Sequence, residues 1–115
     1  MALHCLLLDL KRDAELIARY RHWHRPGNVP GAVVRSIRAA GIEEMEIFQR
    51  DDRLVMLMRT SEAFDAEAKA RADAADPEIV AWEALMSGMQ QPLPGAAPGE
   101  KWLEAEAIFR LSEQP

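Results

Sequence analysis

The segment from Tyr20 to Pro30 holds the side chains of this sequence that are best suited to acid–base chemistry. It contains His22 and His24, two of the three histidines, together with the only tyrosine and one of the three tryptophans. An imidazole titrates near neutral pH, so it can accept and donate a proton. The aromatic side chains beside it provide flat apolar surfaces. This combination suits a pocket for a small polar ligand such as a sugar.

His24 is the residue that we expect to be catalytic. It lies four positions after Tyr20, so the two side chains share one face of a helix, and Tyr20 could hydrogen-bond to His24 or to the ligand. The alternative is that His24 only caps the end of the helix, where a partly positive imidazole suits the helix dipole. His22 points to another face, and we expect it to be exposed. Because His4 is the only other histidine, we expect no metal site.

Trp82 is a second candidate for contact with a ligand. It lies in an apolar stripe that runs from Ile79 to Met89 on a predicted helix, so its alternative role is packing in the core. In a binding site, an indole can lie against the C–H face of a pyranose. Trp23 and Trp102 have the same two interpretations. The sequence lacks phosphate-binding glycine motifs, paired-cysteine redox motifs and zinc-protease motifs, so we expect no cofactor.

The size and composition predict a single globular domain over residues 1–115. A chain of this length can bury one ordinary hydrophobic core. Hydrophobic residues make up 49% of the sequence and charged residues 29%, which fits a soluble globular protein and argues against disorder. The formal net charge is −5 and no basic run stands out, so we expect no nucleic-acid partner.

Targeting signals and cysteine usage predict a cytoplasmic protein. No apolar run approaches the roughly 20 residues of a transmembrane helix, so we expect no membrane partner. The N-terminus resembles no signal peptide, because Leu6-Leu7-Leu8 is followed at once by Asp9 and Lys11. Cys5 is the single cysteine, which excludes an internal disulfide and suits a reducing compartment. Its apolar surroundings favour a core residue over a nucleophile.

Hydrophobic periodicity and capping residues predict the elements that position these side chains. Leu3 to Leu10 predicts a strand whose middle is buried on both faces. Asp13 can cap the following helix, and Pro26-Gly27 ends it. A short amphipathic helix follows over residues 33–40. The remaining predicted elements are a strand over 42–48, a polar turn over 50–53, a partner strand over 54–58, a helix capped by Thr60 or Ser61, a helix starting at Asp76-Pro77, a Pro/Gly loop over 92–99 and a final strand from Trp102 to Leu111.

This order of elements predicts an α+β fold. Two strand–helix–strand halves imply a ferredoxin-like antiparallel sheet with helices on one face. The other face of the sheet would expose leucine, methionine and phenylalanine side chains to water. A second subunit is the expected cover, so we expect a homodimer whose sheets pack face to face.

The ordered set of motifs resembles the L-rhamnose mutarotase family over nearly the whole chain. The resemblance rests on Tyr20-x-x-x-His24-x-Pro26 with the strand and helix before it, on residues 76–82 and on the run from Gln90 to Trp102. Residues 24–29 and the run from Gln90 to Trp102 are most similar to the branch associated with L-fucose use. The resemblance implies a dimeric ferredoxin-like α/β barrel. It also implies interconversion of the α and β anomers of a 6-deoxy-hexopyranose without a cofactor, with a monosaccharide as the partner.

Carried over by position, the resemblance assigns His24 as the catalytic histidine, with Tyr20 and Trp82 as substrate-binding residues. Two departures from the family pattern concern aromatic side chains. The first member of a tryptophan pair is Ala81 here, and Pro30-Gly31 replaces a tryptophan-proline that usually follows the histidine. Both changes remove aromatic walls, so they bear on whether L-rhamnose or L-fucose is the substrate.

Two other functions fit the same residues. One is a non-catalytic sugar-binding or regulatory dimer, in which His24→Ala would weaken binding without abolishing an exchange of anomers. The other is a different enzyme on the same scaffold, for instance a small monooxygenase, because ferredoxin-like dimers host unrelated chemistries. Turnover of an aromatic substrate with oxygen would identify that enzyme.

Overall fold

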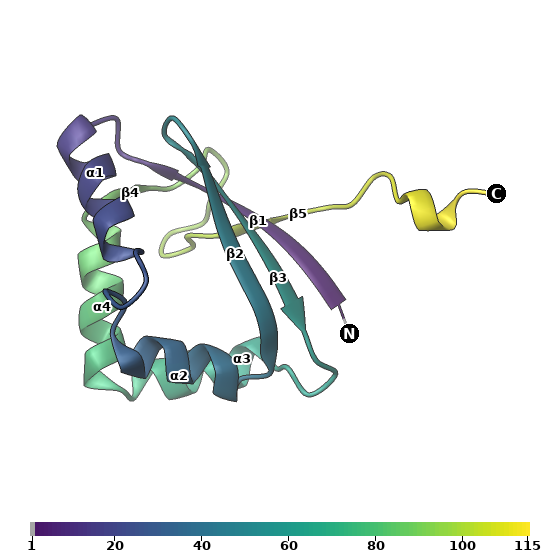
Figure 1. The fold of residues 1–115 in the computed structure, drawn as a ribbon, viewed down its shortest axis with the longest axis horizontal. Coiled ribbons are helices and arrows are strands. Elements are labelled where there is room, and N and C mark those ends of the chain that lie inside the picture. Colours follow the sequence, from purple (N-terminus) through teal and green to yellow (C-terminus); the bar gives the residue numbers. More distant parts are fainter. Residues whose placement is uncertain (1) are drawn as a thin grey trace.

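An antiparallel sheet of five strands forms one layer of the protein (Figure 1). The computed structural model describes residues 2–115. Its strands are β1 (Ala2–Leu10), β2 (Ile42–Arg50), β3 (Arg53–Thr60), β4 (Gln90–Gln91) and β5 (Leu103–Ala105). They are ordered β2-β3-β1-β4, and β5 also pairs with β1. β1 is therefore the central strand, with the long hairpin of β2 and β3 on one side and two short strands on the other.

Four helices connect the strands and lie on one side of the sheet (Figure 1). They are α1 (Ala14–Trp23), α2 (Gly31–Ala39), α3 (Ala66–Ala74) and α4 (Pro77–Ser87), followed near the C-terminus by the short 3₁₀ helix η1 (Leu111–Glu113). This arrangement confirms the predicted α+β fold with helices on one face. The sheet of the single chain is not closed into a barrel, so the dimeric barrel stays a prediction. Within residues 2–115, no helix has the length and apolarity to cross a bilayer.

The aspartates that precede the helices fix where the helices begin. Asp13 accepts hydrogen bonds from the backbone N–H groups of Glu15 and Leu16, at 2.9 and 3.1 Å. Asp76 accepts one from the N–H of Glu78 at 3.0 Å, and Pro77 follows it as the first residue of α4. Side-chain caps of this kind satisfy donors that have no partner inside the helix. The predicted starts of α1 and α4 are thereby confirmed.

The prediction that Thr60 or Ser61 caps the third helix was wrong. Thr60 is the last residue of β3, where it pairs with both neighbouring strands and is buried. The helix starts at Ala66, because the carboxylate of Asp65 accepts hydrogen bonds from two backbone N–H groups of its first turn. A β-branched threonine suits a half-buried strand, and the aspartate is the stronger cap.

The predicted final strand from Trp102 to Leu111 was too long. Only Leu103–Ala105 pairs with β1, opposite Cys5 to Leu7. Farther along the same edge, Asp9 and Leu10 pair with β4, a two-residue strand that the sequence did not predict. After β5 the chain leaves the sheet, and residues 106–115 extend away from the body of the protein (Figure 1).

The hydrophobic core lies between the sheet and the helices. Leu8, Leu10 and Leu54 have the most fully buried side chains of the sheet. The prediction that the middle of β1 is buried on both faces was wrong, because Leu6 and Leu7 are only partly buried. Within residues 2–115 of the single chain, no second layer covers the outer face of the sheet. Ile42, the first residue of β2, is also buried. The other core residues come from the helices and the segment after α4, and they are Tyr20, Ala32, Val33, Ile79, Trp82, Met86 and Met89.

Candidate active site

A cavity of about 550 Å³ opens between the helices and the inner face of the sheet. This volume is in the range of small-molecule binding sites. The cavity contains all three residues that the sequence predicted to act on a ligand, Tyr20, His24 and Trp82. Its apolar walls include side chains of the loop before α2, of α2, α4, β2 and β3, namely Val29, Val33, Ile37, Met45, Ile47, Met56, Ile79 and Met86, with Trp102 from the segment before β5.

His24 stands at the C-terminal end of α1, and its backbone fixes the state of its ring. The Nδ1 atom lies 2.6 Å from the carbonyl oxygen of Tyr20. A carbonyl can only accept a hydrogen bond, so Nδ1 carries the proton and donates it. In the neutral ring Nε2 then holds a lone pair, and no side chain in the described part of the chain hydrogen-bonds to it. This tautomer is the one that can take a proton from a ligand.

Burial sets the charge of His24. It lowers the pKa of the imidazole below its ordinary value of 6.5, and the hydrogen bond to the Tyr20 carbonyl opposes this only in part. The ring is therefore neutral at neutral pH. A residue that served only to compensate the helix dipole would be stabilised as the cation. The position of His24 in the cavity and the lowered pKa of its ring suit a general base. The end of α1 is capped by the backbone N–H of His24 and does not need its side chain.

Aromatic rings surround His24. The ring of Tyr20 lies 4.2 Å from the imidazole, centroid to centroid, at an interplanar angle of 32°. Trp82 meets the imidazole edge-on at 5.6 Å, and Trp23 meets Trp82 edge-on at 6.1 Å. Trp82 is 8% exposed and also belongs to the core. It thus packs in the core and lines the cavity, so both of its predicted roles are compatible with its position.

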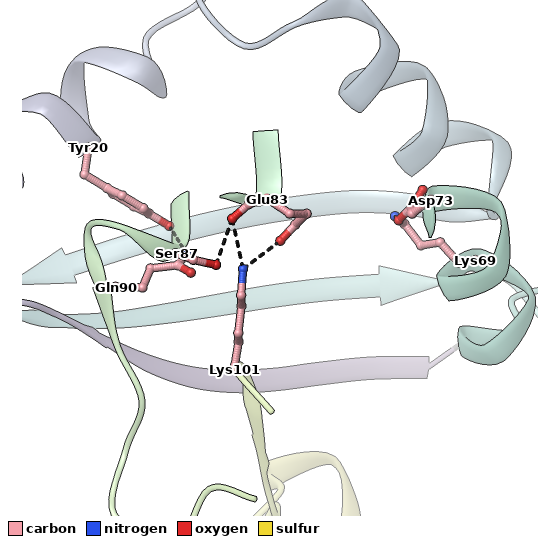
Figure 2. Close-up of polar contacts among 7 residues, drawn as sticks. All are labelled: Tyr20, Lys69, Asp73, Glu83, Ser87, Gln90 and Lys101. Atoms are coloured by element: carbon pink, nitrogen blue, oxygen red, sulfur yellow. Dashed lines mark hydrogen bonds and ion pairs between the residues drawn. The ribbon is translucent and has the colours of Figure 1, made fainter. Parts of the chain in front are cut away.

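Tyr20 is hydrogen-bonded to a residue for which the sequence predicted no role. The Nε2 atom of Gln90 donates to the Tyr20 hydroxyl oxygen at 3.2 Å (Figure 2). Burial raises the pKa of the Tyr20 phenol, the hydrogen bond from Gln90 lowers it, and the negative charge of Glu83 raises it. Gln90 lies in the run that carried the family resemblance. Its position directly after the apolar stripe of α4 was the available signal.

Lys101 attaches the loop before β5 to helix α4. Its ammonium group donates to the carboxylate of Glu83 at 3.0 Å and to the backbone carbonyl of the same residue at 3.2 Å (Figure 2). Ser87 donates to that carbonyl as well, at 2.8 Å. These contacts place the next residue, Trp102, in the wall of the cavity. Lys101 is therefore a paired charge that positions the loop.

Lys69 and Asp73 also line the cavity, and they lie far from Tyr20 and Gln90 (Figure 2). Ser36 of α2 and Lys69 of α3 both donate to the carboxylate of Asp73, and Lys69 also lies 3.4 Å from the Ser36 hydroxyl. These contacts connect α2 to α3. Among the described residues, no three His, Cys, Asp or Glu side chains are grouped in a way that could hold a metal ion.

The positions that depart from the family pattern do not line the cavity. Ala81 precedes Trp82 on α4 and is exposed. Pro30 and Gly31 form the start of α2, and neither lines the cavity. His22 is exposed on α1, as predicted. The indole of Trp82 is therefore the tryptophan that α4 contributes to the cavity, with Trp102 approaching from the loop.

Comparisons with known proteins agree with the resemblance seen in the sequence. Residues 3–111 match the family described as L-rhamnose mutarotase. A protein named L-fucose mutarotase, from Xanthomonas campestris pv. campestris, is 60% identical over 109 residues, which are 95% of this chain and 87% of the relative. Among solved structures, an L-rhamnose mutarotase from Formosa agariphila has a TM-score of 0.65 at 15% identity, over 96% of this chain and 99% of that chain.

The fold itself also occurs with other chemistry. Tetracenomycin F2 cyclase from Streptomyces glaucescens, a type-II polyketide cyclase, has a TM-score of 0.54 at 16% identity and is matched over 96% of both chains. At such identities the two solved structures establish a shared fold alone. Function therefore has to be argued from the family match and from the side chains in the cavity.

Proposed function

Because the chain belongs to the L-rhamnose mutarotase family, we propose that it interconverts the α and β anomers of a 6-deoxy-hexopyranose. The observation that carries the proposal is the ring of His24 in the cavity. Its Nδ1 atom is committed to the Tyr20 carbonyl at 2.6 Å, which leaves Nε2 as a base. A base and a proton donor in one small cavity are what a mutarotase needs, and Tyr20 lies beside His24.

The reaction requires two proton transfers. Nε2 of His24 takes the proton of the anomeric hydroxyl, while Tyr20 or a water molecule protonates the ring oxygen. The bond between C1 and the ring oxygen breaks, and the electron pair of the anomeric O–H bond forms the aldehyde. After rotation about the C1–C2 bond, the former ring oxygen attacks the other face of the aldehyde. During closure the group that acted as the acid takes back the proton of the former ring oxygen, and His24 returns its proton to the anomeric oxygen, so atoms and charges balance.

The energetic demand of this reaction is modest. Anomers interconvert in water without a catalyst, and general acid–base assistance is typically worth about 100- to 10,000-fold. A neutral imidazole with a lowered pKa suits this task at neutral pH. The apolar walls around it also suit the sugar, because they can contact its C–H face and its methyl group. Trp82 and Trp102 are the aromatic surfaces available for this contact.

L-fucose is the substrate that we favour over L-rhamnose. The 60% identical relative is named L-fucose mutarotase, and the match covers 95% of this chain. Polarimetry of each freshly dissolved crystalline sugar tests this choice, because the optical rotation drifts as the anomers equilibrate. We expect the protein to accelerate the drift of L-fucose more than that of L-rhamnose. Equal acceleration of both would contradict the preference for fucose. Binding of the sugar without acceleration would support a non-catalytic sugar-binding protein instead.

We also propose that the chain acts as a cytoplasmic homodimer. On the outer face of the sheet, Leu57 and Val55 lie beside Cys5 and Leu7, and Phe48 pairs with Val55. Phe48 is 51% exposed, and Leu3 at the start of β1 is 59% exposed.

The C-terminal segment adds a second exposed apolar surface. Ile108 is 95% exposed, and Phe109 and Leu111 are exposed beside it, on a stretch that leaves the body of the protein. In the proposed homodimer, the second copy of the chain covers both surfaces. Sedimentation velocity tests this proposal, and a monomer at micromolar concentration would contradict it.

A further inference from the structure

Gln90 is held at the cavity by the sheet. Its backbone pairs with Leu10 at the end of β1, and the preceding residue, Met89, accepts a hydrogen bond from the N–H of Lys11 at 3.0 Å. The Gln90 side chain is 7% exposed and lines the cavity, while the side chain of Gln91 is exposed. This alternation is what a strand imposes on successive residues. Gln90 therefore reaches Tyr20 across a sequence separation of 70 residues.

The direction of the hydrogen bond between Gln90 and Tyr20 decides what Tyr20 can do. The amide Nε2 is only a donor, so the phenol oxygen accepts. The phenol has a single hydroxyl proton, and this proton takes no part in the hydrogen bond with Gln90. No other side chain in the described part of the chain hydrogen-bonds to the Tyr20 hydroxyl. Its O–H is therefore available to donate to a ligand in the cavity.

The carbonyl oxygen of the same amide indicates that the role of Gln90 is not to stabilise the fold. Its Oε1 atom is buried and has no hydrogen-bond partner in the described residues. A buried polar atom without a partner destabilises a protein, whereas an apolar side chain of the same shape does not. Methionine, which has nearly the length of glutamine, would fill this space without an unpaired oxygen. The presence of glutamine at this position is therefore explained by the N–H donor of its amide and not by packing.

We propose that Gln90 is a positioning residue that makes Tyr20 the acid of the reaction. By donating to the phenol oxygen, it directs the Tyr20 O–H away from the protein and toward the ring oxygen of the sugar. His24 then supplies the base and Tyr20 the acid, and no water molecule is needed in that role. This inference rests on the proposed mutarotase function. The donor from Gln90 also stabilises the phenolate that forms when Tyr20 gives up its proton.

A double-mutant cycle tests whether Gln90 acts through Tyr20. We expect Gln90→Met to lower kcat of anomer exchange by about 100-fold, the lower end of the range for general acid–base catalysis, with KM changed less. In the Tyr20→Phe background, Gln90→Met should cause no further loss, because the group that it positions is already absent. Losses that multiply in the double variant would overturn the proposal. Gln91→Met, an exposed neighbour on the same strand, is the matched control and should keep wild-type exchange.

A spectroscopic measurement tests the same contact without any activity. Tyr20 is the only tyrosine of the chain, so the tyrosine Fermi doublet in the Raman spectrum reports this phenol alone. The intensity ratio of the doublet distinguishes a phenol oxygen that accepts a hydrogen bond from one that does not. We expect Gln90→Met to change the ratio and Gln91→Met to leave it unchanged. An unchanged ratio in Gln90→Met would refute the positioning role.

The two measurements separate this proposal from the function on which it rests. A changed Raman doublet with no sugar exchange in the wild-type protein would leave the contact established and reject the mutarotase. Gln90→Glu gives a further check, because a carboxylate can only accept a hydrogen bond. It should draw the Tyr20 proton toward itself and lower exchange at least as much as Gln90→Met. Wild-type exchange in Gln90→Glu would overturn the direction assigned to the hydrogen bond.

Discussion

Replacing His24 with alanine should remove most of the catalytic activity while leaving the fold intact. The change deletes the proposed base, and the loss of general-base assistance is about 100- to 10,000-fold, or about 3 to 5 kcal/mol in the activation free energy. The folding cost is smaller. The variant loses the hydrogen bond from Nδ1 to the Tyr20 carbonyl, about 1 kcal/mol, and the aromatic contacts to Tyr20 and Trp82, about 1 kcal/mol more.

Two measurements on the same protein samples test this prediction. Anomer exchange of L-fucose gives the loss of rate, and urea denaturation gives the change in the free energy of unfolding. His22→Ala is the matched control, because His22 lies on the same helix, is exposed and does not line the cavity that contains His24. We expect it to keep wild-type exchange. A folded His24→Ala variant that exchanges anomers within twofold of the wild-type rate would refute the catalytic role.

The same geometry gives four further predictions. Because burial lowers the pKa of His24, the neutral base form of its ring persists below pH 6.5. The value of kcat/KM should therefore stay constant down to pH 6.5 and fall only as the pH passes through the lowered pKa. A pH–rate profile that falls above pH 6.5 would contradict this. The unfolded chain takes up the proton first, so His24 should also reduce stability as pH falls below 6.5, which denaturation at several pH values measures. Trp82→Ala should destabilise the fold by about 3 to 5 kcal/mol and weaken sugar binding in calorimetry, and unchanged affinity would reduce Trp82 to a packing residue. Phe48→Glu combined with Leu57→Glu should give a folded monomer in sedimentation, because both positions lie on the outer face of the sheet. A dimer that persists in this double variant would place the interface elsewhere.

The local features of the fold could be predicted from the sequence. Asp13 and Asp76 each cap a helix with bonds to residues two or three positions away, so nearby sequence determines them. The hairpin of β2 and β3 follows from alternation around a polar turn. Asp65 was overlooked because the Thr60-Ser61 pair offered an earlier cap of the same kind. Only the pairing of Thr60 with both neighbouring strands excludes that choice.

Features that depend on long-range pairing could not be predicted in the same way. β4 has two residues and no periodicity, and it exists because the end of β1 offers an unpaired edge. The extent of β5 is set by the same edge. In the site, Tyr20 and His24 are neighbours on one helix turn, so their proximity was predictable. The contact of Gln90 with Tyr20 was not, since it depends on where β4 places the side chain.

Saturation-transfer NMR on the anomeric protons of L-fucose tests the central claim most directly, because it measures exchange between the anomers at equilibrium. The proposed function predicts that saturating one anomeric proton reduces the signal of the other in proportion to the concentration of wild-type protein. L-rhamnose, measured in parallel, should show a smaller effect. If the transfer in both sugars equals that of the protein-free solution, the chain is not a mutarotase for either sugar.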